Sequence, residues 1–374
     1  MKEADTFFIN QPSNKIPEDL TSSILNQSKP IEYHKNLSGY QSTPLVHLPS
    51  LAEQYGVSSI HIKDESSRFG LNAFKSLGAS FAIHSLLKSK PDIQTFCTAT
   101  DGNHGRAVAW ASSSSGKQSV IYVPRDTSQN RIEAIKNERA QIIQLDKNYD
   151  ETCEYAERIS KENGWELVQD TAWENYTNIP ALIMAGYQTQ FKEIEDSLHS
   201  LPKPKIDLVF LQVGVGSWAG SGIWYYLNRY GGNRPKIVLV EPEESDGALA
   251  SFLAGKRTSP SGSFETIMGG LNCGIPSLTA WNILKNGADA AMKISDDYAK
   301  KAMRTLYHPV GSDRKITSGE SGAAGLAGFM ALMTDPQFSR LKQHLNITHQ
   351  TRILFFNTEG ATDQDSFDSI VSSI

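Results

Sequence analysis

Short apolar runs alternate with stretches of helical periodicity through most of the chain. The apolar runs predict strands at residues 60–62, 94–98, 120–123, 141–145, 166–168, 207–213, 236–240 and 352–356. Between them, the spacing of apolar residues predicts helices over 75–88, from about 105, and over 129–138, 151–162 and 180–198. The continuous run 207–213 suits a strand that is buried on both faces. This alternation predicts an α/β fold of two lobes, each with a mainly parallel sheet flanked by helices.

The opening stretch differs from the rest of the chain. Up to about Ser50 it is polar and interrupted by prolines, so we expect an irregular arm that lies over the body of the protein. The chain of 374 residues is long enough for two lobes. Its hydrophobic content of 39% and charged content of 21% are typical of a soluble globular enzyme.

Charge and cysteine content argue against several classes of protein. With 36 basic and 41 acidic residues the net charge is −5, and this balance predicts neither a nucleic-acid partner nor a membrane surface. The first residues lack the layout of a signal peptide, and no apolar run is long enough to span a bilayer. The three cysteines are far apart in the sequence and predict neither a disulfide framework nor a metal site. We therefore expect a cytoplasmic enzyme that acts on a small molecule.

Lys75 is the first candidate for chemistry. It follows Phe74 and begins the predicted helix 75–88. A lysine in a mostly apolar pocket, close to a helix N-terminus, is driven toward the neutral amine by desolvation and by the helix dipole. A neutral amine can attack a cofactor aldehyde and can then be exchanged for the amine of a substrate. Taken alone, Lys75 is more readily interpreted as a solvated surface lysine, and only three motifs downstream favour the catalytic interpretation.

The second motif follows the predicted strand 94–98 and opens a helix. Its residues are Asp101, Gly102, Asn103, His104 and Gly105. Small residues at this place allow backbone N–H groups to converge on an anion, here the carboxylate of a substrate. The Asn103 amide can reach the ring oxygen of a cofactor. The simpler alternative is a tight turn in which Asp101 caps the helix.

The third motif is a glycine-rich loop directly after the apolar strand 207–213. Gly214, Val215, Gly216 and Ser217 can cradle a phosphate with main-chain N–H groups at the start of a helix. The spacing also resembles a loose dinucleotide-binding loop, for which Glu241 would be the acid that binds a ribose. The loop lies deep in the chain and not after the first strand, which disfavours this alternative without excluding it.

The fourth motif begins with Thr358, at the end of the last apolar strand. A hydroxyl that faces a pyridine nitrogen is a neutral partner, unlike a carboxylate, which would keep the ring protonated. The ring is then a weaker electron sink, and rapid loss of a β-substituent is favoured over transamination. Together, the four motifs predict a pyridoxal 5'-phosphate site and a β-elimination or β-replacement reaction.

The order and spacing of these motifs resemble those of the fold-type II (tryptophan synthase β-like) pyridoxal phosphate enzymes. Within these enzymes, the chain looks most like the diaminopropionate ammonia-lyases. The resemblance extends over nearly the whole chain from about Thr43 onward. It is carried by residues 63–72 with Lys75, and by residues 100–106, 169–174, 268–274, 318–325 and 358–363.

The resemblance implies a large cofactor-binding lobe of residues 1–83 and 187–374, and a small lobe of residues 84–186 that closes over the substrate. It also implies a homodimeric lyase that splits 2,3-diaminopropionate into pyruvate and two ammonia molecules. Lys75 matches the lysine that holds the cofactor and takes the α-proton of one enantiomer. Asp101 matches an aspartate implicated with the opposite enantiomer. Asp170 matches one near the substrate, although a plain turn at a strand end is an equal alternative.

Asp101 is the feature that favours an ammonia-lyase. Related dehydratases carry a small residue at this position, because the hydroxyl of serine needs no anionic partner. A substrate with a β-ammonium gains a charge-assisted hydrogen bond from a nearby carboxylate. If Lys75 and Asp101 lie on opposite faces of the substrate, each can act as a base toward one α-hydrogen, and both D- and L-substrates can react.

Several alternatives stay open on the sequence alone. A serine or threonine dehydratase, or a cysteine synthase-like β-replacement enzyme, would use the same machinery. A dinucleotide-binding oxidoreductase would use the loop that begins at Gly214. A non-catalytic pyridoxal phosphate-binding protein would have the same motifs without turnover.

Overall fold

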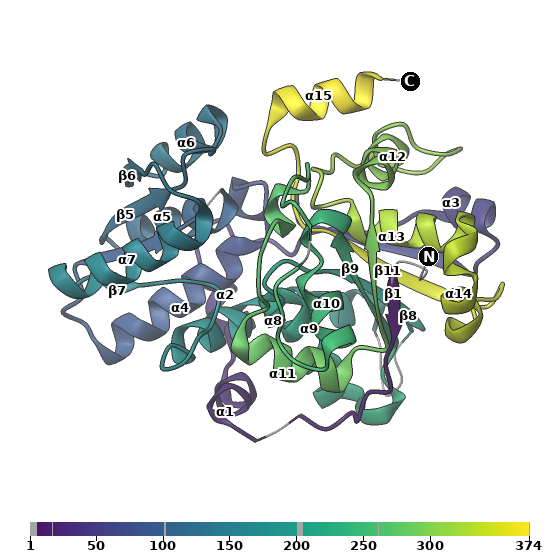
Figure 1. The fold of residues 1–374 in the computed structure, drawn as a ribbon, viewed down its shortest axis with the longest axis horizontal. Helices are drawn as coiled ribbons and strands as arrows, with labels where there is room; N and C mark the ends of the chain where they lie inside the picture. Colours follow the sequence, from purple (N-terminus) through teal and green to yellow (C-terminus); the bar gives the residue numbers. More distant parts are fainter. Residues whose placement is uncertain (1–5, 17, 101, 200–204, 261, 374) are drawn as a thin grey trace.

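Two β-sheets with flanking helices form the framework of the molecule. The computed structural model describes residues 6–16, 18–100, 102–199, 205–260 and 262–373. The larger sheet has the strand order β1-β10-β9-β8-β11-β3-β2 and the smaller one the order β6-β5-β4-β7. The smaller sheet lies at the left of Figure 1 and the larger one in the rest of the molecule. The fold class that the sequence predicts is confirmed, while the limits of the two lobes stay a prediction.

The elements have the following bounds. The strands of the larger sheet are β1 (Phe7–Ile9), β2 (Leu45–His47), β3 (Ser59–Asp64), β8 (Leu208–Gln212), β9 (Lys236–Pro242), β10 (Ala290–Ile294) and β11 (Arg352–Asn357). Those of the smaller sheet are β4 (Thr95–Ala99), β5 (Gln118–Val123), β6 (Gln141–Gln144) and β7 (Glu166–Leu167). The first eight α-helices are α1 (Leu20–Gln27), α2 (Pro30–His34), α3 (Pro49–Tyr55), α4 (Lys75–Ser89), α5 (Asn103–Ser114), α6 (Gln129–Lys136), α7 (Tyr149–Asn163) and α8 (Asn178–Leu198). The others are α9 (Ser217–Tyr230), α10 (Gly247–Ala254), α11 (Leu278–Gly287), α12 (Asp296–Tyr307), α13 (Ala324–Thr334), α14 (Ser339–Leu345) and α15 (Gln364–Ser372).

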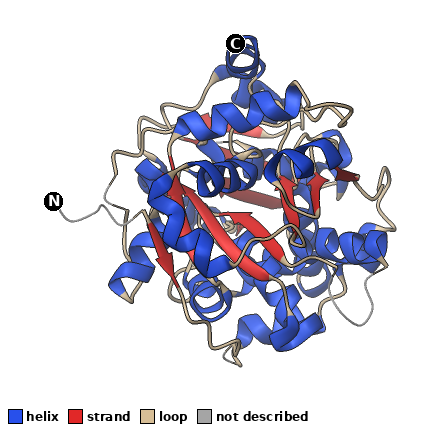
Figure 2. Cartoon of the chain, turned by 90° about the vertical axis from the view of Figure 1, so that its right-hand side faces the viewer, coloured by secondary structure: helices blue, strands red, loops and turns tan. Residues whose placement is uncertain are grey.

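The central strands of the larger sheet are buried on both faces, as the apolar run 207–213 predicts. In β8, Val209 and Leu211 belong to one apolar cluster, whereas Leu208 and Phe210 belong to a second one. Because successive side chains of a strand point to opposite faces, this division shows that helices cover both sides of the sheet. Figure 2 shows the strands enclosed between helices in this way.

Helix α4 joins the two halves of the molecule, because it packs against both α8 and α5. The backbones of α4 and α8 approach each other closely at Gly186. A Cβ atom at this position would lie 2.3 Å from the carbonyl oxygen of Leu77, so a larger residue would force the helices apart. The close packing fixes the start of α4, where Lys75 is located.

The expectation of an irregular N-terminal arm is wrong. The stretch before Ser50 contains β1, which pairs antiparallel with β10, and β2, which pairs antiparallel with β3. It also contains α1, which begins with a capping box between Asp19 and Ser22, and α2, which has Pro30 in its first turn. The proline that suggested irregular structure therefore starts a helix, a position where the missing N–H has no cost.

The other predicted elements are confirmed, with ends moved by a residue or two. Strand β10 and the helices α3 and α10 to α15 have no counterpart among the predictions. Cys97, Cys153 and Cys273 all lie within the described residues, and none of them forms a disulfide bond. Among the helices that the structure describes, none has the length and apolar character needed to cross a membrane.

Candidate active site

One cavity collects nearly all of the residues that the sequence singles out. It is lined by residues that follow β4, β8 and β11, whose carboxyl ends in parallel sheets are the usual place for a ligand site. The predicted residues that line it are Phe74, Lys75, Gly102, Asn103, His104, Asp170, Gly214, Val215, Gly216, Ser217 and Thr358. Asp101 lies outside the residues that the structure describes. The roles proposed for these residues stay predictions.

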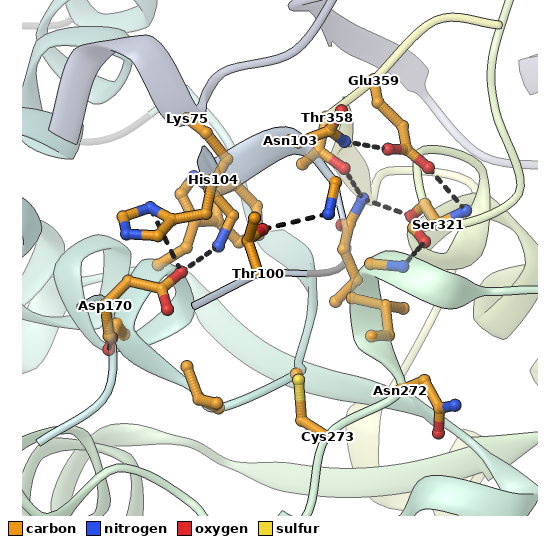
Figure 3. A pocket seen from close by; sticks show the side chains of 18 of the residues that line it. Lys75, Thr100, Asn103, His104, Asp170, Asn272, Cys273, Ser321, Thr358 and Glu359 are labelled. Atoms are coloured by element: carbon orange, nitrogen blue, oxygen red, sulfur yellow. Dashed lines mark hydrogen bonds and ion pairs between the residues drawn. The ribbon is translucent and has the colours of Figure 1, made fainter. Parts of the chain in front are cut away.

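Lys75 and Asp170 form an ion pair in this cavity (Figure 3). The Lys75 Nζ atom lies 2.5 Å from Oδ2 of Asp170, and the two side chains are 20% and 6% exposed. Nδ1 of His104 lies 3.8 Å from the same carboxylate oxygen. The backbone carbonyl of Asp170 accepts a hydrogen bond of 2.6 Å from the Ser217 hydroxyl. Asp170 therefore contacts both Lys75 and the glycine-rich loop. A residue that only formed a turn at the end of a strand would not need these two contacts.

The expectation that Lys75 is neutral is wrong for the protein without cofactor. Burial lowers the pKa of Lys75, but the charge and the hydrogen bond of Asp170 outweigh burial and raise this pKa above its ordinary value. Burial raises the pKa of Asp170, and the opposing effects of His104 and Lys75 lower it to about 2. The pair is thus an ammonium and a carboxylate over the whole physiological range. The sequence did not indicate which carboxylate would face the lysine.

His104 is held from the other side of its ring. Its Nε2 atom lies 2.7 Å from the carbonyl oxygen of Val168. Because a carbonyl only accepts hydrogen bonds, Nε2 carries the proton of this contact. The ring is thereby fixed with Nδ1 toward Asp170.

Thr100 shapes the loop that precedes α5. Its hydroxyl oxygen accepts hydrogen bonds from the backbone N–H groups of Gly102 (3.0 Å) and Gly105 (3.1 Å). A Cβ atom at Gly105 would lie 2.1 Å from the Thr100 methyl group, so the helix can start this close to Thr100 only with glycine. The backbone N–H groups of Gly102 and Gly105, both in the second motif, therefore form hydrogen bonds within the loop itself.

The glycine-rich loop has the form expected of an anion cradle. Gly216 caps α9 with a φ of 90°, which favours glycine, and α9 begins at Ser217. A Cβ atom at Gly214 would lie 3.0 Å from Sγ of Cys273 and 3.2 Å from the carbonyl oxygen of Gly270. The loop therefore presents its backbone to the cavity at the N-terminus of a helix, where the dipole favours negative charge.

Thr358 has a partner that leaves its hydroxyl hydrogen available. Nε2 of Gln212 donates a hydrogen bond of 3.1 Å to Oγ1 of Thr358 and another to the carbonyl oxygen of Phe356. Because the hydroxyl oxygen accepts from Gln212, its own O–H can be donated to a ligand atom in the cavity. A neutral donor of this kind suits an unprotonated ring nitrogen.

Three lining residues, Arg131, Tyr149 and Gln212, belong to none of the motifs or segments that carry the sequence-based resemblance. Others lie in those segments or directly after the glycine-rich loop, but the sequence assigned them no role: Thr100, Trp218, Ala219, Gly270, Leu271, Asn272, Cys273, Ser321 and Glu359. For Gln212 a signal exists, since it is a polar residue at the end of a buried apolar strand. Glu359 lies in the segment 358–363 that carries the resemblance, but the sequence alone assigned no role to it. For Arg131, on a surface-type amphipathic helix, the sequence offers no signal.

The cavity fits the cofactor that the sequence predicts. Nε1 of Trp218 and Oε1 of Gln212 are buried polar atoms without a hydrogen-bond partner among the described residues, and both side chains line the cavity. Such atoms are costly unless a ligand or water binds them. Lys75 can bind the aldehyde of this cofactor, the loop 214–217 can bind its phosphate, and Thr358 can bind its pyridine ring. In contrast, the carboxylate of Glu241 caps α10 by accepting the N–H groups of Ala248 and Leu249 (2.8 and 2.7 Å), which removes the ribose acid of the dinucleotide alternative.

Comparison with known proteins agrees with this fit. Residues 37–343 match the family model described as pyridoxal-phosphate dependent enzyme. Diaminopropionate ammonia-lyase of Escherichia coli (strain K12) is 39% identical over 383 residues, which cover 97% of this chain and 96% of the relative.

Two solved structures of diaminopropionate ammonia lyase from Escherichia coli have the same fold. One is in complex with an aminoacrylate-PLP azomethine reaction intermediate, with a TM-score of 0.89, 37% identity, and coverage of 98% of this chain and 96% of that chain. The other is in complex with D-serine, with a TM-score of 0.89, 36% identity and the same coverage. The chain therefore belongs to the pyridoxal-phosphate-dependent enzymes and, within them, to the diaminopropionate ammonia-lyase family.

Proposed function

We propose that this enzyme splits 2,3-diaminopropionate by α,β-elimination, with water as co-substrate, into pyruvate and two molecules of ammonia. The observation that carries the proposal is the pair of Lys75 and Asp170 in a cavity that also holds Thr358 and the glycine-rich loop. The family relationship supports the same reaction. When bound, pyridoxal phosphate supplies an aldehyde that captures amines and a ring that withdraws electrons from the substrate α-carbon.

Each part of the cofactor has its own binding residues in this proposal. Lys75 provides the amine that holds the aldehyde. Gly214, Val215, Gly216 and Ser217 bind the phosphate with backbone N–H groups and a hydroxyl. Thr358 donates a hydrogen bond to the cofactor's ring nitrogen, and Asn103 donates one to its ring oxygen. Phe74 packs beside Lys75, and the Lys75 Nζ atom lies 5.5 Å from the centroid of the Phe74 ring.

The acidic residues recognise a substrate with two amino groups. Beside His104 and the Lys75 ammonium, the pKa of the Asp170 carboxyl is lowered to about 2, so this group is anionic in the ion pair. Once the Lys75 nitrogen is engaged, this carboxylate accepts a charge-assisted hydrogen bond from the β-ammonium of the substrate. Gly102, which directly precedes α5, and His104, in its first turn, complete the substrate site beside Asp101 in the sequence. Serine and threonine, whose β-group is a neutral hydroxyl, gain less from the same carboxylate.

We further propose that both enantiomers react. Lys75 removes the α-proton of one enantiomer and Asp101 that of the other. Ammonia leaves from the β-carbon, and the 2-aminoacrylate that is released hydrolyses to pyruvate and the second ammonia. The binding of D-serine by the relative from Escherichia coli supports a site that accepts the D-configuration.

The test is the rate of pyruvate release by the purified holoenzyme from D- and L-diaminopropionate, L-serine and L-threonine. We expect both diaminopropionate enantiomers to react much faster than serine and threonine. Asp101→Asn should impair one enantiomer more than the other. The reverse ranking of substrates would establish a dehydratase instead. Tight binding of pyridoxal phosphate without turnover of any of the four would establish a binding protein.

The assembly and the lobes are part of the same proposal. We propose a cytoplasmic homodimer in which residues 84–186 close over the substrate, as the family resemblance implies. Sedimentation velocity of the holoenzyme tests the dimer, and a monomer at micromolar concentration would contradict it. Slower hydrogen exchange in residues 84–186 after addition of substrate would support closure.

A further inference from the structure

A hydrogen bond crosses the cavity from one sheet system to the other. Asn103 is the first residue of α5, which follows β4 of the smaller sheet, whereas Glu359 follows β11 of the larger sheet. Nδ2 of Asn103 donates a hydrogen bond to Oε2 of Glu359 (Figure 3). The two residues are 256 positions apart in the sequence, and both line the cavity.

Glu359 is itself held firmly. It is 5% exposed, and its Oε1 atom accepts a hydrogen bond of 3.2 Å from the backbone N–H of Ser321. Its backbone forms a β-bridge with Ala73, two residues before Lys75, and its carbonyl accepts from the N–H of Gly319 (3.0 Å). The Glu359 carboxylate is therefore held in one position, close to the start of α4.

A fixed carboxylate determines how the Asn103 amide is turned. An ionised carboxylate only accepts hydrogen bonds, so it must face the NH2 group of the amide and not its oxygen. The NH2 group has two N–H bonds, and Glu359 accepts one of them. The second N–H therefore keeps a defined direction in the cavity, and a flip of the amide would place two oxygens against each other.

We propose that Glu359 is a positioning residue that turns the Asn103 amide so that its second N–H binds the ring oxygen of the cofactor. This inference rests on the proposed function, in which Asn103 is the donor to that oxygen. It adds that two neighbouring residues at the end of β11 hold both edges of the ring. Thr358 meets the nitrogen directly, and Glu359 acts on the oxygen through Asn103.

The charges around Glu359 are consistent with this role. Burial and the nearby Glu320 raise the pKa of Glu359, whereas Arg131, the Asn103 amide and the Ser321 N–H oppose this rise. The Asn103 donor is therefore one of the groups that limit this rise and favour the ionised form of Glu359. Asn103 thus favours the ionised form of Glu359, and the ionised carboxylate in turn fixes the orientation of the Asn103 amide.

A double-mutant cycle on cofactor binding tests the inference without substrate. The protein is freed of cofactor, and the dissociation constant for pyridoxal phosphate is measured by absorbance for wild type, Glu359→Gln, Asn103→Ala and the double variant. Glu359→Gln keeps the size of the side chain but can meet either end of the amide. We expect each single variant to bind about 10-fold more weakly. The double variant should bind no more weakly than Asn103→Ala, because Glu359 acts through Asn103.

Glu320→Gln is the matched control, since Glu320 is a neighbouring buried carboxylate that accepts from the Ser366 hydroxyl instead (2.5 Å). It should bind pyridoxal phosphate at least as tightly as wild type, because removing the Glu320 charge favours the ionised form of Glu359 and leaves its hydrogen bond to Asn103 in place. Wild-type affinity in Glu359→Gln, or losses that add in the double variant, would overturn the positioning role. Thermal unfolding of each variant shows whether a loss comes from misfolding. If the wild type itself binds no pyridoxal phosphate, the proposed function fails and not this inference alone.

Discussion

Two groups of buried charges in this protein differ in how far their side chains are exposed. The first, which we call the ion network, consists of Lys63, Glu65, Arg68 and Glu193. The second is the pair of Lys75 and Asp170 in the cavity. Both contain a lysine against a carboxylate at 2.5–2.6 Å. The side chains of the network are at most 2% exposed, whereas Lys75 is 20% exposed and opens to the cavity.

In the ion network, each charge has several partners. Glu193 accepts from Lys63 (2.6 Å) and from Nη2 of Arg68 (2.7 Å), and its neighbour Glu65 accepts from Nε of Arg68 (2.8 Å). Thr43 adds a hydroxyl donor to Glu65 at 2.6 Å. Burial raises the pKa of Glu193, but Arg68 and Lys63 lower it to about 2. A charge group with all of its hydrogen bonds satisfied can be sealed from water, and it then fixes β3 to α8.

In the cavity the charges are left available to a ligand. In the proposed mechanism, Lys75 releases Asp170 when it binds the cofactor aldehyde, and the Asp170 carboxylate can then bind the substrate. The comparison teaches that solvent exposure distinguishes two uses of similar ion pairs. A fully buried pair stabilises the fold, whereas a pair that opens to a cavity is available to a ligand. The network holds the scaffold that positions α4, whereas we propose that the cavity pair performs chemistry.

Replacing Lys75 should have the largest effect on activity. Lys75→Ala removes the proposed amine and α-proton base, and we expect turnover of diaminopropionate to fall by about 10²- to 10⁴-fold or more. Initial rates of pyruvate release measure the loss. Lys88→Ala is the control, because Lys88 is an exposed lysine on the last turn of the same helix. Wild-type turnover in Lys75→Ala would place the chemistry elsewhere.

Breaking the ion network should instead reduce stability. Glu193→Gln leaves two buried cations short of a counter-charge, and we expect the free energy of unfolding to fall by about 3–5 kcal/mol. Urea unfolding measures this change, and the molecules that stay folded should keep their kcat. Glu157→Gln breaks an exposed pair with Lys161 and should cost less than about 1 kcal/mol. An equal loss in both variants would remove the distinction between sealed and open pairs.

Replacing Asp170 should cost less stability, and the cost should depend on pH. The pKa of Asp170 is lowered from 3.8 to about 2, so its ionised form stabilises the folded protein above pH 3.8 by about 2 kcal/mol. This contribution disappears as the pH falls through 2. In urea unfolding of the cofactor-free protein, the difference between wild type and Asp170→Asn should therefore shrink between pH 5 and pH 2.5. A constant difference over this range would contradict the ion pair.

The smallest expected effect is a shift in the reactivity of Lys75. The Asp170 charge raises the pKa of Lys75, so Asp170→Asn should allow this amine to lose its proton at lower pH. Acylation of Lys75 in the cofactor-free protein, followed by mass spectrometry from pH 7 to pH 10, measures the shift. Lys88 serves as an internal reference in the same digest. An unchanged pH profile for Lys75 would show that burial and not Asp170 dominates its titration.

The sequence predicted those parts of the molecule whose signals are local. Apolar runs gave β8 and β11, and the glycine-rich loop was recognisable because it follows a buried strand. Contacts between distant segments left no local signal. The charge of Lys75 depends on Asp170, 95 positions away, and the partner of Asn103 is 256 positions away. For the same reason β1 was missed, since its three residues are a strand only through pairing with β10.

The most direct test of the central claim is to find the residue that binds the cofactor. The holoenzyme is reduced with borohydride, digested, and searched by mass spectrometry for the added pyridoxyl group. We predict that the group is found on the peptide that contains Lys75. Its presence on another lysine, or on none, would contradict the account.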